Sequence, residues 1–130
     1  MSRNHEKIKS AGRFAYEGID RVIHEKARLS IVSSLAAHPN GLLFNDLKEL
    51  CALTDGNLSR HLTLLADAGI VEVWKGTKNN RPQTLCRLTA AGRKRFIEYV
   101  GTLEQVIAYA AKADDAAPRN AAPEGFSPAT

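Results

Sequence analysis

The sequence predicts a mainly α-helical fold with one small antiparallel β-hairpin. In four segments between residues 19 and 112, apolar residues recur every three or four positions, which is the period of an amphipathic helix. Between the third and fourth segments the pattern becomes β-prone, and a stretch rich in turn-forming residues divides it in two. A chain of 130 residues suits a single domain with one core.

The first two helices are expected at residues 19–38 and 46–52. Asp20 and Asn45 stand where N-caps belong, because their side chains can accept hydrogen bonds from the free N–H groups of a first turn. A Pro-Asn-Gly run separates the two helices. The apolar stretch 41–44 that follows is short enough to form one small strand.

A tight connection leads to the third helix, expected at residues 55–68. Thr54 can cap its first turn, and Gly69 stands where a left-handed C-terminal residue is expected. Three leucines at positions 58, 62 and 65 form its apolar stripe, so this side of the helix should face the core.

Two strands, at residues 70–74 and 83–88, form the expected hairpin. The stretch 75–82 between them predicts a loop that is too long for a two-residue turn. Thr89 then caps a last helix, residues 90–112, which would be roughly 34 Å long at 1.5 Å per residue. Two helices joined by a short turn, with a hairpin after the second, form the order of a winged helix-turn-helix domain.

The sequence therefore divides into four parts. Residues 1–18 are an N-terminal extension, and residues 19–89 are the winged helix-turn-helix domain. Residues 90–112 form a long C-terminal helix that we expect to mediate dimerisation. Residues 113–130 are rich in alanine, carry three prolines and show no periodicity, which predicts a disordered tail.

Charge is distributed unevenly along the chain. The formal net charge is +4, but the last 18 residues total −2, which leaves +6 on residues 1–112. A basic body attracts phosphate polymers. This balance favours a nucleic-acid partner but does not establish one.

The face of the third helix opposite the leucines is small and polar. A helical projection places Gly56, Arg60 and Thr63 there, flanked by Asn57 and Ser59. Small residues let a helix approach the floor of a groove, while Asn57 and Arg60 can form bidentate bonds, typically with adenine and guanine respectively. The sequence thus predicts that this helix reads bases in the major groove of double-stranded DNA.

The hairpin is basic and polar. Between Trp74 and Arg87 there are basic residues and no acidic ones, so the hairpin can lie along phosphates or enter a minor groove. Trp74 is expected to pack between hairpin and helix rather than to stack on bases. The predicted DNA contacts of this wing are Lys75, Lys78, Asn79, Asn80 and Arg81.

Two stretches resemble the MarR/ArsR-like winged-helix regulators: LTDGNLSRHLTLLADAGIVEV and the following WKGTKNNRPQTLCRLTAAGRKRF. The resemblance covers roughly residues 19–108 and is strongest to a compact subgroup whose recognition helix reads TDGNLSxHL. It implies that residues 54–63 enter the major groove and that residues 78–81 form the wing tip. For His61 it implies a phosphate contact, against the alternative of a half-buried histidine bonded locally. The resulting recognition-helix set is Thr54, Gly56, Asn57, Ser59, Arg60, His61 and Thr63.

The resemblance also implies a homodimer held by the last helix, and often by the first. This agrees with the apolar stripe of the last helix, which is longer than a winged domain of about 75 residues can cover. The alternative is that the stripe belongs to the core. The expected interface residues are Phe96, Tyr99, Val100, Leu103, Val106 and Ile107.

Other classes of protein are disfavoured. Cys51 and Cys86 form no CxxC pair and are expected to be buried free thiols, and Leu53 stands where a thiolate metal sensor would carry its second cysteine. We find no catalytic set and no phosphate-binding glycine loop, so neither an enzyme, a cofactor nor a metal is expected. No signal peptide or membrane span is seen, and the chain should be soluble and cytoplasmic.

The sequence thus predicts a sequence-specific regulator of transcription that binds double-stranded DNA as a homodimer, with repression as the expected outcome. The rival interpretation is a winged helix that contacts only protein. A small-molecule effector between the long helices is compatible with the sequence, which shows no convergent polar set to identify one.

Overall fold

The computed structural model describes residues 16, 18–114 and 122–129. The chain divides into two compact units, Met1–Tyr99 and Val100–Thr130. Most of the expected N-terminal extension and part of the expected tail lie outside the described residues. Among those that are described, no helix has the length and apolar character needed to cross a bilayer.

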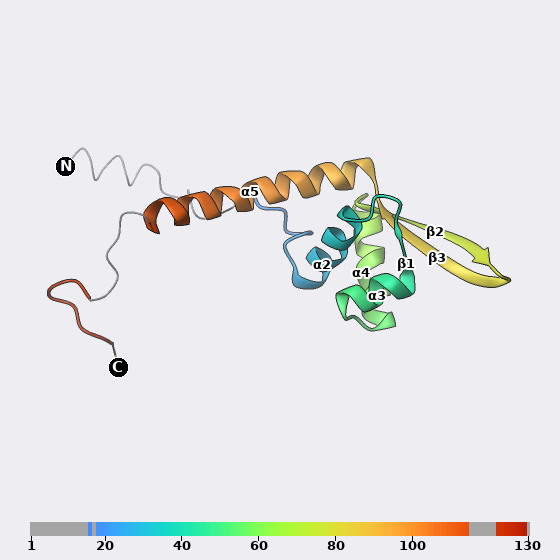
Figure 1. Ribbon diagram of the computed structural model, residues 1–130, viewed down its shortest axis with the longest axis horizontal. Helices are drawn as coiled ribbons and strands as arrows, with labels where there is room; N and C mark the ends of the chain where they lie inside the picture. The colour runs from blue at the N-terminus through green and yellow to red at the C-terminus, as the bar shows by residue number, and fades with distance from the viewer. Residues whose placement is uncertain (1–15, 17, 115–121, 130) are drawn as a thin grey trace. The chain divides into compact units, whose positions relative to one another are not determined.

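The described elements follow the predicted order, helix, short strand, two helices, hairpin and long helix (Figure 1). The fold is therefore the expected winged helix-turn-helix, with a long C-terminal helix. The elements are α2 (Lys26–Ala36), β1 (Leu42–Leu43), α3 (Phe44–Cys51), α4 (Asp55–Asp67), β2 (Val71–Lys78), β3 (Arg81–Leu88) and α5 (Ala90–Asp114).

The start of helix α2 differs from the prediction. The helix begins at Lys26 rather than at residue 19, and its N-cap is Glu25, whose side chain accepts a hydrogen bond from Arg28 N–H. Asp20 is therefore not a helix cap. It closes a turn by accepting hydrogen bonds from two following backbone N–H groups at 3.0 and 3.2 Å. The apolar residues of this turn face inward without being helical, Ile23 buried and Ile19 and Val22 half-buried, which is why periodicity alone extended the helix too far.

The short strand β1 joins the hairpin to make a three-stranded antiparallel sheet in the order β1-β3-β2. Leu42 pairs with Cys86 and Leu43 with Leu85. The chain passes directly from this strand into α3, whose N-cap is Leu43 and makes no side-chain cap bond. The predicted cap at Asn45 is therefore wrong, because that residue already lies inside the helix.

The wing is a regular hairpin and not the long loop that the sequence predicts. Strand pairing continues to Lys78 and Arg81, so the turn contains only Asn79 and Asn80. Both asparagines have positive φ, 54° and 62°. A two-residue hairpin turn of this twist needs left-handed residues, and asparagine tolerates that conformation better than most.

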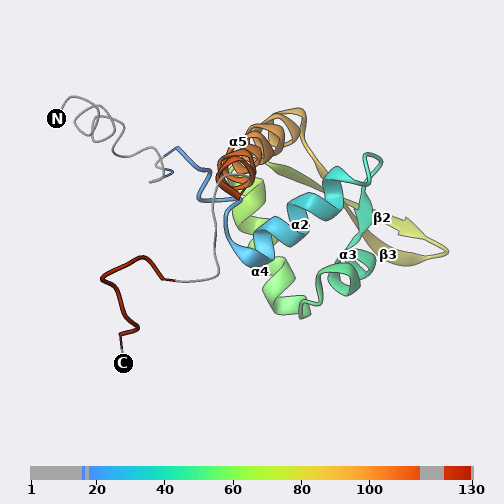
Figure 2. The ribbon, with the colours of Figure 1, turned by 60° about the vertical axis from the view of Figure 1, so that its left-hand side comes forward.

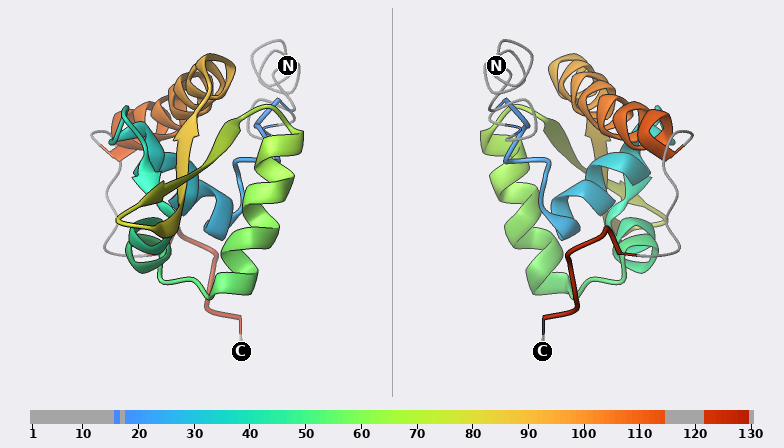
Figure 3. Two further views of the ribbon diagram at one scale, coloured as in Figure 1. Left: turned by 90° about the vertical axis from the view of Figure 1, so that its right-hand side faces the viewer. Right: turned by 90° about the vertical axis from the view of Figure 1, so that its left-hand side faces the viewer.

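The core lies among helices α2, α3 and α4 and the face of the sheet that they contact. Helix α2 lies between α3 and α4, as the views in Figures 2 and 3 show. The buried hydrophobic residues are Ile23, Ile31, Val32, Leu35, Leu47, Leu58, Leu62, Leu65, Ile70, Val71, Cys86, Leu88 and Tyr99. The burial of these apolar side chains holds the helices and the sheet in fixed positions relative to one another.

The start of α5 is fixed against the end of α4. The Thr89 hydroxyl donates to the Gly69 carbonyl at 2.6 Å and accepts from Gly92 N–H at 2.8 Å, as the predicted N-cap should. Gly69 has φ of +75°, the left-handed conformation expected of it. A Cβ at Gly92 would lie 2.0 Å from the Ile70 carbonyl oxygen, so the helix approaches the chain more closely there than any other residue would allow.

Both cysteines are free. Cys86 is buried as predicted, and burial raises the pKa of its thiol to about 11. Cys51 is only partly buried, and its sulfur lies 3.6 Å from the Ser34 hydroxyl. Burial also raises the pKa of Cys51, so neither thiol is poised as a nucleophile.

Candidate nucleic-acid interface

Helix α4 is held from its buried side. Leu58, Leu62 and Leu65 are 0–4% exposed, so the predicted leucine stripe does face the core. The N-cap is Thr54, whose side chain accepts a hydrogen bond from Asn57 N–H at 3.2 Å. These contacts fix which face of the helix is presented to solvent.

The outward face carries the residues that the sequence selected. Gly56, Asn57, Ser59, Arg60 and Thr63 are all exposed, as is the N-cap threonine. Arg60 Nη2 donates to Asn57 Oδ1 at 3.3 Å, and the Thr63 hydroxyl donates to the Ser59 carbonyl at 3.0 Å. Because no atom lies within 4 Å of a Cβ built at Gly56, the approach to this end of the helix is open.

His61 is set apart from this face. Its side chain is 9% exposed and lies with the leucines, and its Nδ1 has no hydrogen-bond partner among the described residues. A buried donor or acceptor without a partner costs free energy. The structure therefore shows no local hydrogen bond at Nδ1 among the described residues. The His61 side chain also does not lie on the exposed face of α4 that carries Asn57 and Arg60.

The wing presents a basic tip. Lys78, Asn79, Asn80 and Arg81 are all exposed and lie together at the turn of the hairpin. Lys75 is exposed further down strand β2, where its ammonium group donates to the Thr84 hydroxyl at 3.1 Å. The structure thus brings the five predicted wing residues onto one projecting hairpin.

A groove joins the recognition helix to the wing. A cavity of about 300 Å³ lies between α4 and the sheet, with Phe44, Leu62 and Val73 among its apolar lining. Ser59 and Lys75, one from each predicted contact set, also line it. Sequence reasoning missed the two apolar residues outside α4, although Val73 was detectable from the period-two alternation of its strand.

Trp74 does not pack between hairpin and helix as the sequence predicted. It is 50% exposed and pairs across the sheet with Leu85, whereas its neighbour Val73 pairs with the buried Cys86 on the side facing the helices. The Arg87 guanidinium lies 5.4 Å from the Trp74 ring centroid, within cation–π distance.

Arg87 also ties the two strands together at the base of the wing. Its Nε donates to a carboxylate oxygen of Glu72, the residue opposite it in the sheet. This hydrogen bond lowers the pKa of Glu72. Glu72 therefore stays ionised, and its negative charge is balanced by the Arg87 guanidinium in the same ion pair.

The expected interface residues of α5 fall into three groups by exposure: buried, exposed and half-buried. Tyr99 is 3% exposed, and its hydroxyl lies 2.7 Å from His24 Nδ1, so it is a core residue of its own chain. Ile107 is 66% exposed, and Ile97, which the sequence analysis did not select, is 64% exposed. The remaining members are half-buried: Phe96, Val100, Leu103 and Val106.

A three-helix core that presents a polar helix beside a basic hairpin defines a winged helix DNA-binding protein. The family model described as "Winged helix DNA-binding domain" matches residues 27–107, and the chain belongs to this family. An uncharacterized protein of Methanocaldococcus jannaschii is 41% identical over 63 residues, which make up 48% of this chain and 68% of that protein.

Solved structures agree with this assignment. A transcriptional regulator homologue from Pyrococcus horikoshii superposes with a TM-score of 0.62 at 25% identity, covering 82% of this chain and 95% of its own. The Staphylococcus aureus regulator MepR, in a complex with DNA, has a TM-score of 0.57 at 19% identity, covering 87% and 89%. The second likeness shows the fold alone. Together these findings confirm the predicted resemblance to winged-helix transcriptional regulators, and the likeness to solved MarR-family regulators is one of fold.

Proposed function

We propose that this protein is a homodimeric transcriptional repressor that binds a short palindromic operator in a sequence-specific way. The observation that carries the proposal is the two-sidedness of α4. Leu58, Leu62 and Leu65 are buried, and three polar residues are exposed on the opposite face: Asn57, Ser59 and Arg60. Base recognition requires solvent-exposed side chains on a helix that is held in place by its buried face.

Helix α4 fits the major groove with its N-terminal half leading. Gly56 adds no side chain that would hold the backbone away from the bases, and Asn57 and Arg60 supply hydrogen-bond donors to base edges. Its first-turn N–H groups also suit a phosphate. In this arrangement the helix supplies the sequence preference.

The wing supplies affinity that does not depend on sequence. Lys78 and Arg81 flank the turn and can neutralise phosphates, releasing condensed counterions from the duplex. The asparagines between them offer amide groups to the backbone or to a minor groove. Every complex formed by the wing should therefore weaken as salt is raised.

Dimerisation through α5 supplies the symmetry of the operator. The exposed Ile107 and the half-buried Leu103 and Val106 give this helix apolar surface for a second copy. A two-fold axis would then place the recognition helices in successive major grooves, about 34 Å apart. A dimer seated on an operator that overlaps a promoter would exclude polymerase, which gives repression.

Binding to a random library of duplex DNA at several salt concentrations tests the central claim. We expect salt-dependent binding, followed by enrichment of an inverted repeat after rounds of selection. Absence of binding at low salt would instead support the rival function, a winged helix that contacts only protein.

The dimer has its own test. Leu103→Asp should give a monomer by light scattering, whereas Gln105→Asp, an exposed position on the same helix, should leave the dimer intact. If Leu103→Asp is still a dimer, the interface must lie on a surface other than this part of α5.

A further inference from the structure

We propose that Arg95 is a positioning residue for DNA recognition. By clamping the C-terminal end of α4 to α5, it sets the separation of operator half-sites that the dimer accepts. This inference rests on the proposed function, because it needs a dimer joined through α5 and a recognition helix in each half-site. Arg95 itself would touch neither DNA nor the partner.

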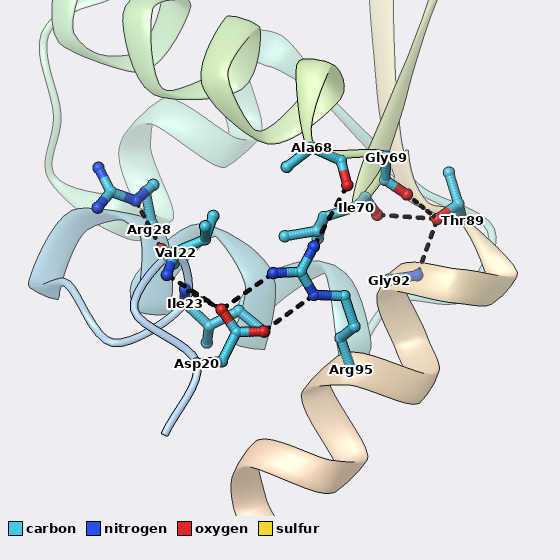
Figure 4. A network of polar contacts seen from close by, with 10 residues as sticks. All are labelled: Asp20, Val22, Ile23, Arg28, Ala68, Gly69, Ile70, Thr89, Gly92 and Arg95. Carbon is cyan, nitrogen blue, oxygen red and sulfur yellow. Dashed lines mark hydrogen bonds and ion pairs between the residues drawn. The ribbon is translucent and has the colours of Figure 1, made fainter. Parts of the chain in front are cut away.

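The clamp has three hydrogen bonds, all drawn in Figure 4. Arg95 Nε donates to Asp20 Oδ2 at 2.9 Å, and Nη2 donates to Asp20 Oδ1 at 3.1 Å. Nη1 donates to the carbonyl of Ala68, the C-cap of α4, at 3.3 Å. One planar guanidinium thus joins three segments that are distant in sequence: the N-terminal turn, the end of α4 and the first part of α5.

Asp20 is itself fixed, so it can act as an anchor. Its Oδ1 accepts hydrogen bonds from Val22 and Ile23 N–H, and its side chain is only 17% exposed. Burial raises the pKa of Asp20, but the hydrogen bonds from Arg95 and from backbone N–H groups outweigh burial and leave the pKa below its ordinary value. The carboxylate therefore stays charged at neutral pH and holds the guanidinium in place.

Two attachment points are needed to fix the angle between two helices. The first is the junction at Thr89 and Gly92, where α5 begins. The second is Arg95, which bonds to the α4 C-cap from a position between one and two turns further along α5. Arg93 and Tyr99 also hold α5, through the Ala36 carbonyl of α2 at 3.4 Å and His24 Nδ1 at 2.7 Å. Arg95 differs from them because its hydrogen bond reaches α4 itself.

The clamp acts at the end of α4 far from its base-reading residues. Helix α4 spans Asp55–Asp67, so it is about 20 Å long. A tilt of about 10° at its C-terminal end would move its N-terminal end by about 3 Å, close to the rise of one base pair. A change of about 10° in the angle between α4 and α5 would therefore shift each recognition helix by about the length of one base pair along the DNA.

Lysine could not do the same work. A single ammonium group is a point charge without the planar fork that spans both oxygens of Asp20 and the Ala68 carbonyl at once. Arg95→Lys keeps the charge and most of the side-chain length, so it separates the loss of the clamp from the loss of a positive charge.

The test uses the full chain and a series of duplexes. The inverted repeat selected by the wild type is synthesised with its native separation and with one base pair added or removed, and Kd is measured by fluorescence anisotropy. One base pair also rotates a half-site by about 34°, so we expect wild type to prefer its native separation by about tenfold or more. Lys94→Ala, which removes a neighbouring exposed charge of α5, is the matched control.

Arg95→Ala and Arg95→Lys should both reduce this preference to within about threefold, with dimers unchanged by light scattering and each protein folded at the assay temperature. Lys94→Ala should keep the wild-type preference. A purely stabilising role for Arg95 would lower the melting temperature and leave the spacing preference intact, which would overturn the proposal.

If Arg95→Ala fails to fold, Arg95→Lys decides, because a folded lysine variant with full spacing preference also overturns the proposal. A wild type that binds no duplex would overturn the proposed function itself, a result distinct from both.

Discussion

The recognition helix and the wing both present polar residues to solvent, but they are supported in different ways. Helix α4 is anchored by three leucines that are at most 4% exposed. The wing tip beyond Trp74 is exposed on strand β2 and is held mainly by pairing between its two strands. A rigid support suits base reading, whereas a hairpin supported only by its partner strand suits contact with phosphates. The difference suggests that specificity resides in α4 and general affinity in the wing.

The largest expected effect disturbs both regions at once. Gly92→Ala would place a Cβ 2.0 Å from the carbonyl of Ile70, which lies in the connection between α4 and β2, directly before the first residue of β2. Since that obstacle is backbone and cannot rotate away, we expect the free energy of unfolding to fall by about 3 kcal/mol. Chemical denaturation measures the loss.

Gly101→Ala is the matched control, because no atom lies within 4 Å of a Cβ at that position of the same helix. It should stabilise the protein by roughly 0.5–1 kcal/mol through helix propensity. If Gly92→Ala instead stabilised the protein as much as Gly101→Ala does, only helix propensity would be acting and the close approach to Ile70 would carry no cost.

The next effect concerns α4 alone. Arg60→Ala should cost roughly 1–3 kcal/mol of binding to the selected operator and relax the preference at one base position. Binding to random duplex should weaken much less. Selection with the variant checks this, and an unchanged base preference would show that Arg60 contacts only the backbone.

A smaller effect is expected at the wing. Lys78→Ala or Arg81→Ala should weaken binding to all duplexes alike and reduce the salt dependence by about one ion per residue. Titrations at several salt concentrations, with selected and random DNA, measure both quantities. A loss confined to the selected operator would instead assign base reading to the wing and remove the contrast with α4.

The two regions also differ in how far sequence could predict them. Helix α4 was predicted with its cap and outward face because its signals are local: Thr54, Gly69 and the leucine period. The wing turn was predicted wrongly, because Asn79 and Asn80 lie among other turn formers and resemble an irregular loop. Whether two asparagines adopt positive φ depends on the strands that flank them.

Contacts between segments distant in sequence could not be predicted either, because local patterns do not show which residues meet in the fold. Asp20 is a good N-cap by type, and nothing near it indicates that its carboxylate bonds to Arg95, 75 positions away. The exposure of Trp74 likewise depends on which face of the sheet the helices cover. A local pattern identifies an element, but it does not select the partner of a charged or aromatic side chain.

The smallest effect tests the turn of the wing itself. Asn80 has φ of 62°, so replacing it with alanine, which lacks the local hydrogen bonding that eases this conformation, should cost about 1 kcal/mol. Asn80→Gly should be neutral or slightly stabilising, since glycine adopts positive φ without steric cost. Hydrogen exchange of the hairpin amides should show loosening only in the alanine variant, with α4 unaffected in both. If glycine loosens the hairpin as much as alanine does, the asparagine side chain and not the backbone conformation holds the turn.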